Sequence, residues 1–257
     1  MGLGDNLMAT GMARGAKERG ETIAFGDGQR LIWDHNSETI FLNNPNIARP
    51  GHDLSRARWI NFYKGNRLYN VQDHARERWV WNMEFRATPG EMFLEPDELK
   101  FAKRYGAGFV LIEPNVPDKL TGPNKLWPLD RYQRLGEWLK RDGYEVVQFE
   151  YPGIRRALRG VRMLQVKGFR QALSVLRNAR LVICCEGGLH HGAAAMGRPA
   201  VVLFGGFVPP QVTGYDTHEN IAVGEACGRY MPCDHCRAAM DAISLDEVYV
   251  RARKLLC

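Results

Sequence analysis

The sequence predicts an α/β protein built on a parallel sheet that is covered by helices on both faces. The main observation is that the second half of the chain alternates short apolar runs with amphipathic segments. Apolar runs bounded by turn residues are typical of buried parallel strands, and helical periodicity between them is typical of crossover helices. The composition agrees, because a 257-residue chain with 45% hydrophobic and 25% charged residues is ordinary for a folded protein.

The alternation places each element of the second half. The apolar runs predict strands at 109–112, 145–149, 181–184 and 200–204. The amphipathic segments predict helices at 131–141, 169–178 and 190–196, and a last helix from Ser244, where Ser-Leu-Asp-Glu forms a capping box.

The first half is less regular. It predicts a helix at 5–19 and strands at 22–25, 59–63 and 78–81, separated by loops rich in Asn, Pro and Gly. Residues 87–96 contain two prolines and a glycine, which is typical of a linker. We therefore expect two domains, residues 1–95 and residues 96–257.

The charge distribution and the N-terminal sequence bear on the possible ligands of the protein and on its location in the cell. Between Gly153 and Arg180 there are eight Lys or Arg and no Asp or Glu. This basic stretch is either a solvated helix face or a cationic wall for a nucleotide diphosphate, a phosphorylated glycolipid or a nucleic acid. The N-terminus lacks the order of a signal peptide, and no apolar run approaches the roughly 18 residues of a membrane span, so we expect a cytoplasmic protein.

Two turns place candidate polar groups where ligands of open α/β sheets bind. Gly2-Leu-Gly-Asp5 leads directly into a helix, whose N-terminus favours negative charge, and Asp5 is either a helix cap or a base. Lys125 lies in a Pro-containing loop before a helix and is either a phosphate contact or a solvated lysine.

A third turn, residues 185–191, joins a strand to a helix. Gly187 and Gly188 expose backbone N–H groups that can hold a pyrophosphate, and Glu186 can accept hydrogen bonds from ribose hydroxyls. His191 is either a phosphate contact or a structural hydrogen-bonding residue.

In order and spacing, the three turns resemble those of glycosyltransferase family 9, the ADP-heptose:lipopolysaccharide heptosyltransferases. Gly2-Leu-Gly-Asp5 resembles the opening loop of the family, and Lys125-Leu-Trp-Pro resembles its Lys-x-Trp-Pro segment. Residues 179–205 resemble its signature, in which Asp-Ser/Thr-Gly-x-x-His-x-x-Ala-Ala lies between two strands. The resemblance runs with gaps from Gly2 to the final helix and is poor from about residue 26 to 90.

This resemblance implies a GT-B fold, with two Rossmann-like domains that have parallel sheets. The N-terminal domain, on the acceptor side, would be reduced, and the C-terminal domain would bind the nucleotide-sugar donor. Asp5 would be the general base of an inverting transfer, and Lys125 would lie beside the donor phosphates. The signature turn would bind the nucleotide through Glu186, Gly187, Gly188, Leu189 and His191.

Three features depart from the pattern of the family. Glu186 stands where the family usually has Asp, and Gly187 stands where it has Ser or Thr, so a hydroxyl contact to phosphate is lost. The chain also begins at the opening loop, so either an upstream strand belongs to the protein or the first sheet lacks its first strand.

We therefore expect a metal-independent enzyme without a cofactor, because no Asp-x-Asp motif is present. It would move a heptose-like sugar from an ADP-linked donor to a hydroxyl of a lipopolysaccharide core or another surface glycan, in peripheral contact with the inner membrane. Two alternatives stay open: a transferase for a protein or modified-DNA acceptor, which keeps nucleic acid among the partners, and a non-catalytic nucleotide-sugar-binding protein.

The cysteines permit a further interpretation. Cys227, Cys233 and Cys236 lie close in sequence together with His235, but structural zinc usually takes four ligands with a second pair. Where family members often have a last cysteine before a Met, this chain has Ala239. The sequence thus favours free thiols over a metal site.

Overall fold

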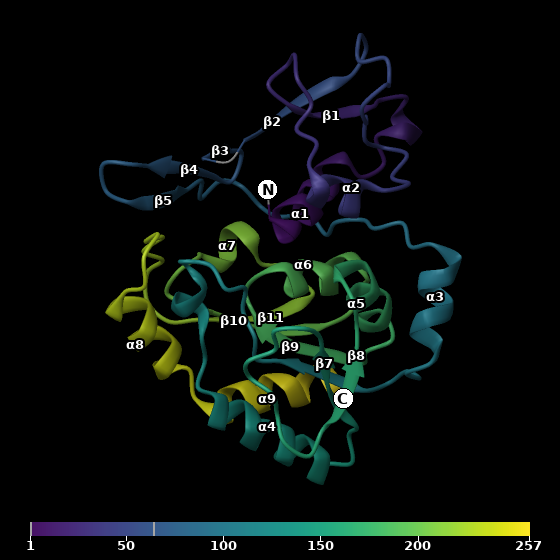
Figure 1. The fold of residues 1–257 in the computed structure, drawn as a ribbon. Coiled ribbons are helices and arrows are strands. Elements are labelled where there is room, and N and C mark those ends of the chain that lie inside the picture. The colour runs from purple at the N-terminus through teal and green to yellow at the C-terminus, as the bar shows by residue number, and fades with distance from the viewer. Residues whose placement is uncertain (1, 64) are drawn as a thin grey trace.

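The computed structural model describes residues 2–63 and 65–257 and contains two sheets that lie one above the other (Figure 1). The elements before residue 95 are α1 (Leu3–Ala13), the 3-10 helix η1 (Lys17–Arg19), β1 (Ile23–Gly26), α2 (His35–Phe41), β2 (Arg58–Tyr63), β3 (Asn66–Arg67), β4 (Asn70–Asp73) and β5 (Arg78–Trp81). Among the described residues, no helix has both the length and the apolar character needed to cross a bilayer.

The second part of the chain contains the strands and helices predicted from the sequence, together with further elements. Its elements are α3 (Pro96–Lys103), β6 (Val110–Glu113), η2 (Gly122–Lys125), α4 (Leu129–Arg141), β7 (Val146–Glu150), β8 (Arg162–Gln165), α5 (Phe169–Leu176), β9 (Leu181–Cys185), α6 (Gly188–Ala195), β10 (Ala200–Gly205), α7 (Pro210–Thr213), β11 (His218–Ala222), α8 (Asp234–Ala242) and α9 (Leu245–Leu256). The sequence does not predict the strands β8 and β11 or the helices α3, α7 and α8. The last helix begins as expected with Ser244 as its N-cap residue, whose side chain accepts a hydrogen bond from the Glu247 N–H at 3.1 Å.

The six strands of the second sheet have the order β11-β10-β9-β6-β7-β8, and all pairs are parallel. Alternate residues of β9 face opposite sides of this sheet. Val182 and Cys184 join the core formed with α5, α6 and α1, whereas Leu181 and Ile183 join the core formed with α4 and α9. Figure 1 shows the same layering, with α4 and α9 below the sheet and α5 and α6 above it. The α/β class is therefore confirmed.

The first sheet corrects the expectation of two parallel sheets. Its order is β1-β2-β3-β4-β5, and only β1 and β2 pair in parallel. The strands from β2 to β5 follow one another through short turns, which are too short for the crossover connection that parallel pairing requires. The result is an antiparallel ribbon that extends over the second sheet (Figure 1).

Helix α1 packs between the two sheets and begins earlier than the sequence predicts. It starts at Leu3 and ends at Ala13, because the chain turns at Arg14 and Gly15, where φ of Gly15 is +68°. The extended segment before α3 packs against this helix: the Glu91 N–H donates to Thr10 Oγ1 at 2.7 Å, and a Cβ on Gly90 would lie 2.2 Å from the Leu7 carbonyl oxygen. The division into domains 1–95 and 96–257 stays a prediction.

Candidate functional site

The three turns predicted from the sequence lie together at the carboxyl ends of β6 and β9. Lys125, at the end of η2, pairs with Glu186, which directly follows β9. The first turn of α1 reaches the same place, since a Cβ on Gly4 would lie 3.1 Å from Gly188 Cα and 3.0 Å from His191 Cδ2. Glycine at position 4 thus favours this close approach of α1 to the N-terminus of α6, because a larger side chain would push the two helices apart by a few tenths of an ångström.

The Lys125–Glu186 ion pair is largely withdrawn from solvent. The side chains of Lys125 and Glu186 are 16% and 8% exposed, and the Lys125 ammonium lies 5.1 Å from the ring centroid of Phe207. A solvated surface lysine would be far more exposed. The pair places one cation and one hydrogen-bond acceptor at the mouth of the turn before α6, where an anionic ligand with hydroxyl groups could contact both.

The turn from β9 into α6 is held by His190. Gly187 has φ +155°, a conformation that glycine adopts readily and a Ser or Thr would not. Its N–H donates to His190 Nδ1 at 3.1 Å, and the other ring nitrogen then carries the proton and donates to the Thr213 carbonyl at 2.8 Å. Gly188 and Leu189 begin α6, two residues before the helix predicted from the sequence, and N–H groups of a first helical turn have no partner within the helix. These two N–H groups are the ones suited to an anion.

His191 is buried beneath the turn instead of lying at its surface. Its Nδ1 is 2.7 Å from the Tyr215 hydroxyl, and its Nε2 is 4.0 Å from Glu186 Oε1. Burial lowers the pKa of His191 to about 3, so the ring is neutral at pH 7. A neutral ring can orient Glu186 or donate one hydrogen bond, but it cannot attract a phosphate by its charge.

Acid pH should weaken the fold through these buried rings. Burial lowers the pKa of His218 to about 4, and the ring of His218 lies 5.4 Å from that of Tyr215. The unfolded chain therefore takes up protons first, and this contribution to stability is complete above pH 6.5 and is lost as the pH falls toward 4. As the pH falls from 6.5 to about 5, we expect the free energy of unfolding to decrease by roughly 1–2 kcal/mol less in His218→Gln than in the wild type, as measured by urea unfolding.

The comparison with the wild type is needed because Glu113 acts in the opposite direction. Burial raises the pKa of Glu113 to about 7, so its protonation favours the folded state as the pH falls. The exposed His52 supplies the control His52→Gln, which keeps Glu113 and should follow the wild-type profile. Parallel pH profiles for His218→Gln and the wild type would contradict this role of burial.

Asp5 has partners that the sequence did not reveal. Its Oδ2 accepts a hydrogen bond from the Gly2 N–H at 3.2 Å, so it closes the first turn of α1 from inside the helix and is not the N-cap residue itself. Its Oδ1 accepts a hydrogen bond from the Tyr69 hydroxyl at 2.5 Å, and Arg67 Nη2 lies 3.7 Å from Oδ2. The Asp5 side chain nevertheless stays 31% exposed, so a ligand can still reach it.

Arg67 is the last residue of β3, Tyr69 lies in the turn between β3 and β4, and both side chains are buried. Burial raises the pKa of Tyr69, as does the neighbouring Asp5 carboxylate, so the hydroxyl stays protonated and acts as a donor. The Arg67 guanidinium lies 5.6 Å from the Tyr69 ring centroid and 5.4 Å from that of Trp79. Nothing in the local sequence pattern marks these residues, because their role depends on contacts with a helix more than sixty positions away.

The basic stretch of residues 153–180 does not form a single cationic wall. Arg155 pairs with Asp118 at 2.6 Å, Arg162 with Glu145 at 2.8 Å and Arg170 with Glu98 at 2.6 Å. The three acidic partners come from different segments, so these guanidinium groups are neutralised locally. The stretch gives little support to nucleic acid as a partner.

A cavity of about 340 Å³ opens beside the first turn of α1. Leu3, His35, Thr39, Lys167 and Phe169 contribute to its lining. Phe169 also reaches the turn from β9 into α6, because a Cβ on Gly188 would lie 3.2 Å from the Cε2 atom of Phe169. The cavity is thus next to the junction of α1 and α6.

A curated relative and a solved structure that are similar to this chain are heptosyltransferases. Lipooligosaccharide heptosyltransferase 2 of Haemophilus influenzae is 34% identical over 102 aligned residues, which cover 35% of this chain and 30% of the relative. The structure of E. coli ADP-heptose lps heptosyltransferase II has a TM-score of 0.48 and 19% identity, covering 69% of this chain and 54% of that one. The chain spans about a third of the length of the curated relative and about half of that structure.

The fold match extends over nearly the whole chain in another structure. The bacterial iron-containing dodecameric glycosyltransferase TibC from enterotoxigenic E. coli has a TM-score of 0.62 and 16% identity, covering 99% of this chain and 76% of TibC. That likeness supports the GT-B arrangement of two sheets. The model of the family described as Glycosyltransferase family 9 (heptosyltransferase) matches residues 73–241, well over half of the chain. The chain therefore belongs to glycosyltransferase family 9.

Proposed function

We propose that this protein transfers a heptose-like sugar from an ADP-linked donor to an acceptor hydroxyl, with inversion at the anomeric carbon. The observation that carries the proposal is the junction of α1 and α6. There, Gly4 in the first turn of α1, which also contains Asp5, packs against Gly188 at the start of α6. Glu186, which pairs with Lys125, lies two residues before Gly188. This junction supports a site in which a carboxylate suited to proton removal would act beside groups suited to a nucleoside diphosphate.

The donor would lie across the N-terminus of α6. The backbone N–H groups of Gly188 and Leu189 and the helix dipole would hold the diphosphate. Lys125 would turn from Glu186 to the phosphate oxygens, and Glu186 would then accept hydrogen bonds from the ribose hydroxyls. The diphosphate would replace one anionic partner of Lys125 with another, so the ammonium would keep a counter-charge in a partly buried position.

In the transfer, Asp5 would take the proton of the acceptor hydroxyl as its oxygen attacks the anomeric carbon. The bond from that carbon to the diphosphate breaks on the opposite face, and the leaving diphosphate gains negative charge. Lys125 and the N–H groups of α6 would stabilise that charge. Tyr69 and Arg67 would hold the Asp5 carboxylate in position. No step needs an added metal, so Mg²⁺ or Mn²⁺ should leave the rate unchanged.

The acceptor would be a sugar hydroxyl of a lipopolysaccharide core or another surface glycan. The name of the curated relative, a lipooligosaccharide heptosyltransferase, supports this choice. The reaction would take place in the cytoplasm at the inner membrane surface, where such glycolipids are assembled.

A thermal-shift panel with ADP, UDP, GDP and dTDP and their sugars tests the proposal. ADP and ADP-heptose should raise the melting temperature, because a ligand at a hundred times its Kd stabilises the fold by about 2.7 kcal/mol. A larger shift with another nucleotide would change the proposed nucleotide of the donor but would still support a glycosyltransferase. If no nucleotide or nucleotide sugar raises the melting temperature, the proposed function is wrong.

A further inference from the structure

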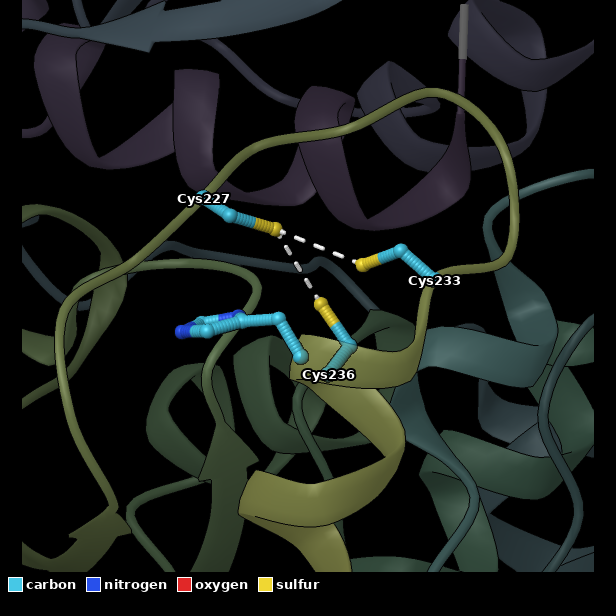
Figure 2. A group of neighbouring side chains, drawn as sticks. Cys227, Cys233 and Cys236 are labelled. Carbon is cyan, nitrogen blue, oxygen red and sulfur yellow. Dashed lines mark hydrogen bonds between the residues drawn. The ribbon is translucent and has the colours of Figure 1, made fainter.

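Four side chains with metal-binding atoms converge between β11 and the first turn of α8. Cys227 Sγ lies 3.2 Å from Cys236 Sγ and 3.8 Å from Cys233 Sγ (Figure 2). His235 completes the group, and one ligand atom from each of the four residues lies within 4.8 Å of all the others. The group is separate from the Lys125–Glu186 pair and has no part in the proposed transfer.

The geometry fits a tetrahedral metal site. With metal–sulfur bonds of about 2.3 Å, a tetrahedral centre separates its sulfur ligands by about 3.8 Å. The Cys227–Cys233 distance of 3.8 Å matches this value, and the Cys227–Cys236 distance of 3.2 Å would widen slightly around an ion. None of the three is in a disulfide. Three neutral thiols gain little from one another, because S–H is a weak donor and sulfur a weak acceptor. The histidine supplies the fourth ligand that the sequence lacked at Ala239.

We propose that Cys227, Cys233, Cys236 and His235 bind one thiolate-preferring metal ion, zinc or iron. Three thiolates and an imidazole form a donor set suited to either ion. The ion would be structural, since the residues already supply four ligands. The proposal does not depend on the transferase function, and its tests are independent of turnover.

The loop closed by this cluster holds the residue next to Lys125. Asn124 is buried, and its side-chain N–H groups donate to the carbonyls of Arg229 at 3.3 Å and Met231 at 3.0 Å. Its Oδ1 accepts a hydrogen bond from the Cys233 N–H at 2.9 Å. The metal would therefore fix the loop that positions η2.

The same loop contacts the first sheet. The Trp79 N–H donates to the Gly228 carbonyl at 2.9 Å, and the Tyr230 N–H donates to the Glu77 carbonyl at 3.1 Å. Gly228 has φ +64°, and a Cβ there would lie 2.3 Å from the Trp79 carbonyl oxygen. Trp79 in turn packs against Arg67, a partner of Asp5. One ion would thus secure a loop that contacts both η2 and the hairpin beside Asp5.

Elemental analysis of the purified, reduced protein tests the proposal. We expect about one zinc or iron per chain, and the element found distinguishes the two ions. Cys227→Ser and Cys236→Ser should lose the metal. The matched control is Cys257→Ser, because Cys257 is an exposed cysteine far in sequence from the cluster. This control variant should retain the metal. Metal content that is unchanged in Cys227→Ser and Cys236→Ser would overturn the site.

Cobalt titration of the metal-free wild type keeps the test open if a serine variant fails to fold. Co²⁺ should bind at about one ion per chain and give a thiolate-to-metal charge-transfer band that His235→Ala weakens and Cys257→Ser leaves intact. Hydrogen exchange should slow in residues 122–126 and 226–236 when the ion binds. A reduced wild-type protein that holds neither zinc nor iron and gives no cobalt band would refute the proposal.

Discussion

Asp5→Asn is expected to lower turnover roughly a hundred- to ten-thousand-fold, the usual contribution of a positioned general base. The amide keeps the shape of the side chain but has one acceptor oxygen. With that oxygen toward the Gly2 N–H, its NH2 group can donate to the Tyr69 hydroxyl oxygen, so the first turn of α1 should stay folded. Donor affinity should change little, because the proposed donor contacts come from η2 and the turn before α6. The measurement is the rate of nucleoside diphosphate release together with donor binding by calorimetry.

The matched control is Asp53→Asn. Asp53 is exposed and accepts local hydrogen bonds from the Ser55 N–H at 2.9 Å and the Ser55 hydroxyl at 3.0 Å. Its replacement should leave turnover at the wild-type rate. If Asp5→Asn transfers sugar as fast as this control, the base lies elsewhere and the proposed mechanism fails.

Lys125→Ala is expected to affect both binding and transfer. Hydrogen bonds to charged groups contribute about 1.5–3 kcal/mol, so donor affinity should fall roughly ten- to a hundred-fold. Turnover should fall as well, because the leaving diphosphate loses a cation. The variant also leaves the buried Glu186 without its partner, which should lower the melting temperature of the free protein.

A second substitution separates the two effects of Lys125. Lys125→Ala combined with Glu186→Gln removes the unpaired charge, so the melting temperature should recover while donor affinity stays low. The control for the loss of a lysine is Lys119→Ala, because Lys119 is exposed on the same loop. Donor affinity equal to that of Lys119→Ala would show that Lys125 does not contact the phosphates.

The strands β6, β7, β9 and β10 of the second sheet could be predicted from the sequence because they are short, largely apolar runs. The two edge strands, β8 and β11, carry polar and charged residues and were missed. Every residue of β6, β9 and β10 is buried, so their hydrophobicity follows directly from their position. The three turns could be located for the same reason, since each lies at the end of a predicted strand or the start of a predicted helix.

The first sheet could not be predicted in the same way. β3 contains only Asn66 and Arg67, and β4 is Asn70–Asp73, so neither carries an apolar pattern. Their pairing depends on short turns and on the contact of Trp79 with the loop at Gly228, which is more than a hundred positions away. The partners of Asp5 come from this ribbon, and they were missed with it.

The cysteine group illustrates the limit of spacing rules. The sequence showed a Cys-x-x-Cys pair with Cys227 and His235 as further possible ligands, but the absence of a second pair and of a cysteine at Ala239 favoured free thiols. The structure brings Cys227 to the pair and places His235 within ligand distance. Which residue completes such a set depends on how the loop folds, and local spacing does not contain that information.

Hydrogen exchange with and without ADP tests the central claim most directly, namely that the turn from β9 into α6 and the end of η2 form the donor site. ADP should slow amide exchange in residues 186–191 and 122–126, and Lys125→Ala should reduce that protection at the same ADP concentration. Unchanged exchange in both segments, at an ADP concentration that raises the melting temperature, would place the nucleotide elsewhere and contradict the site.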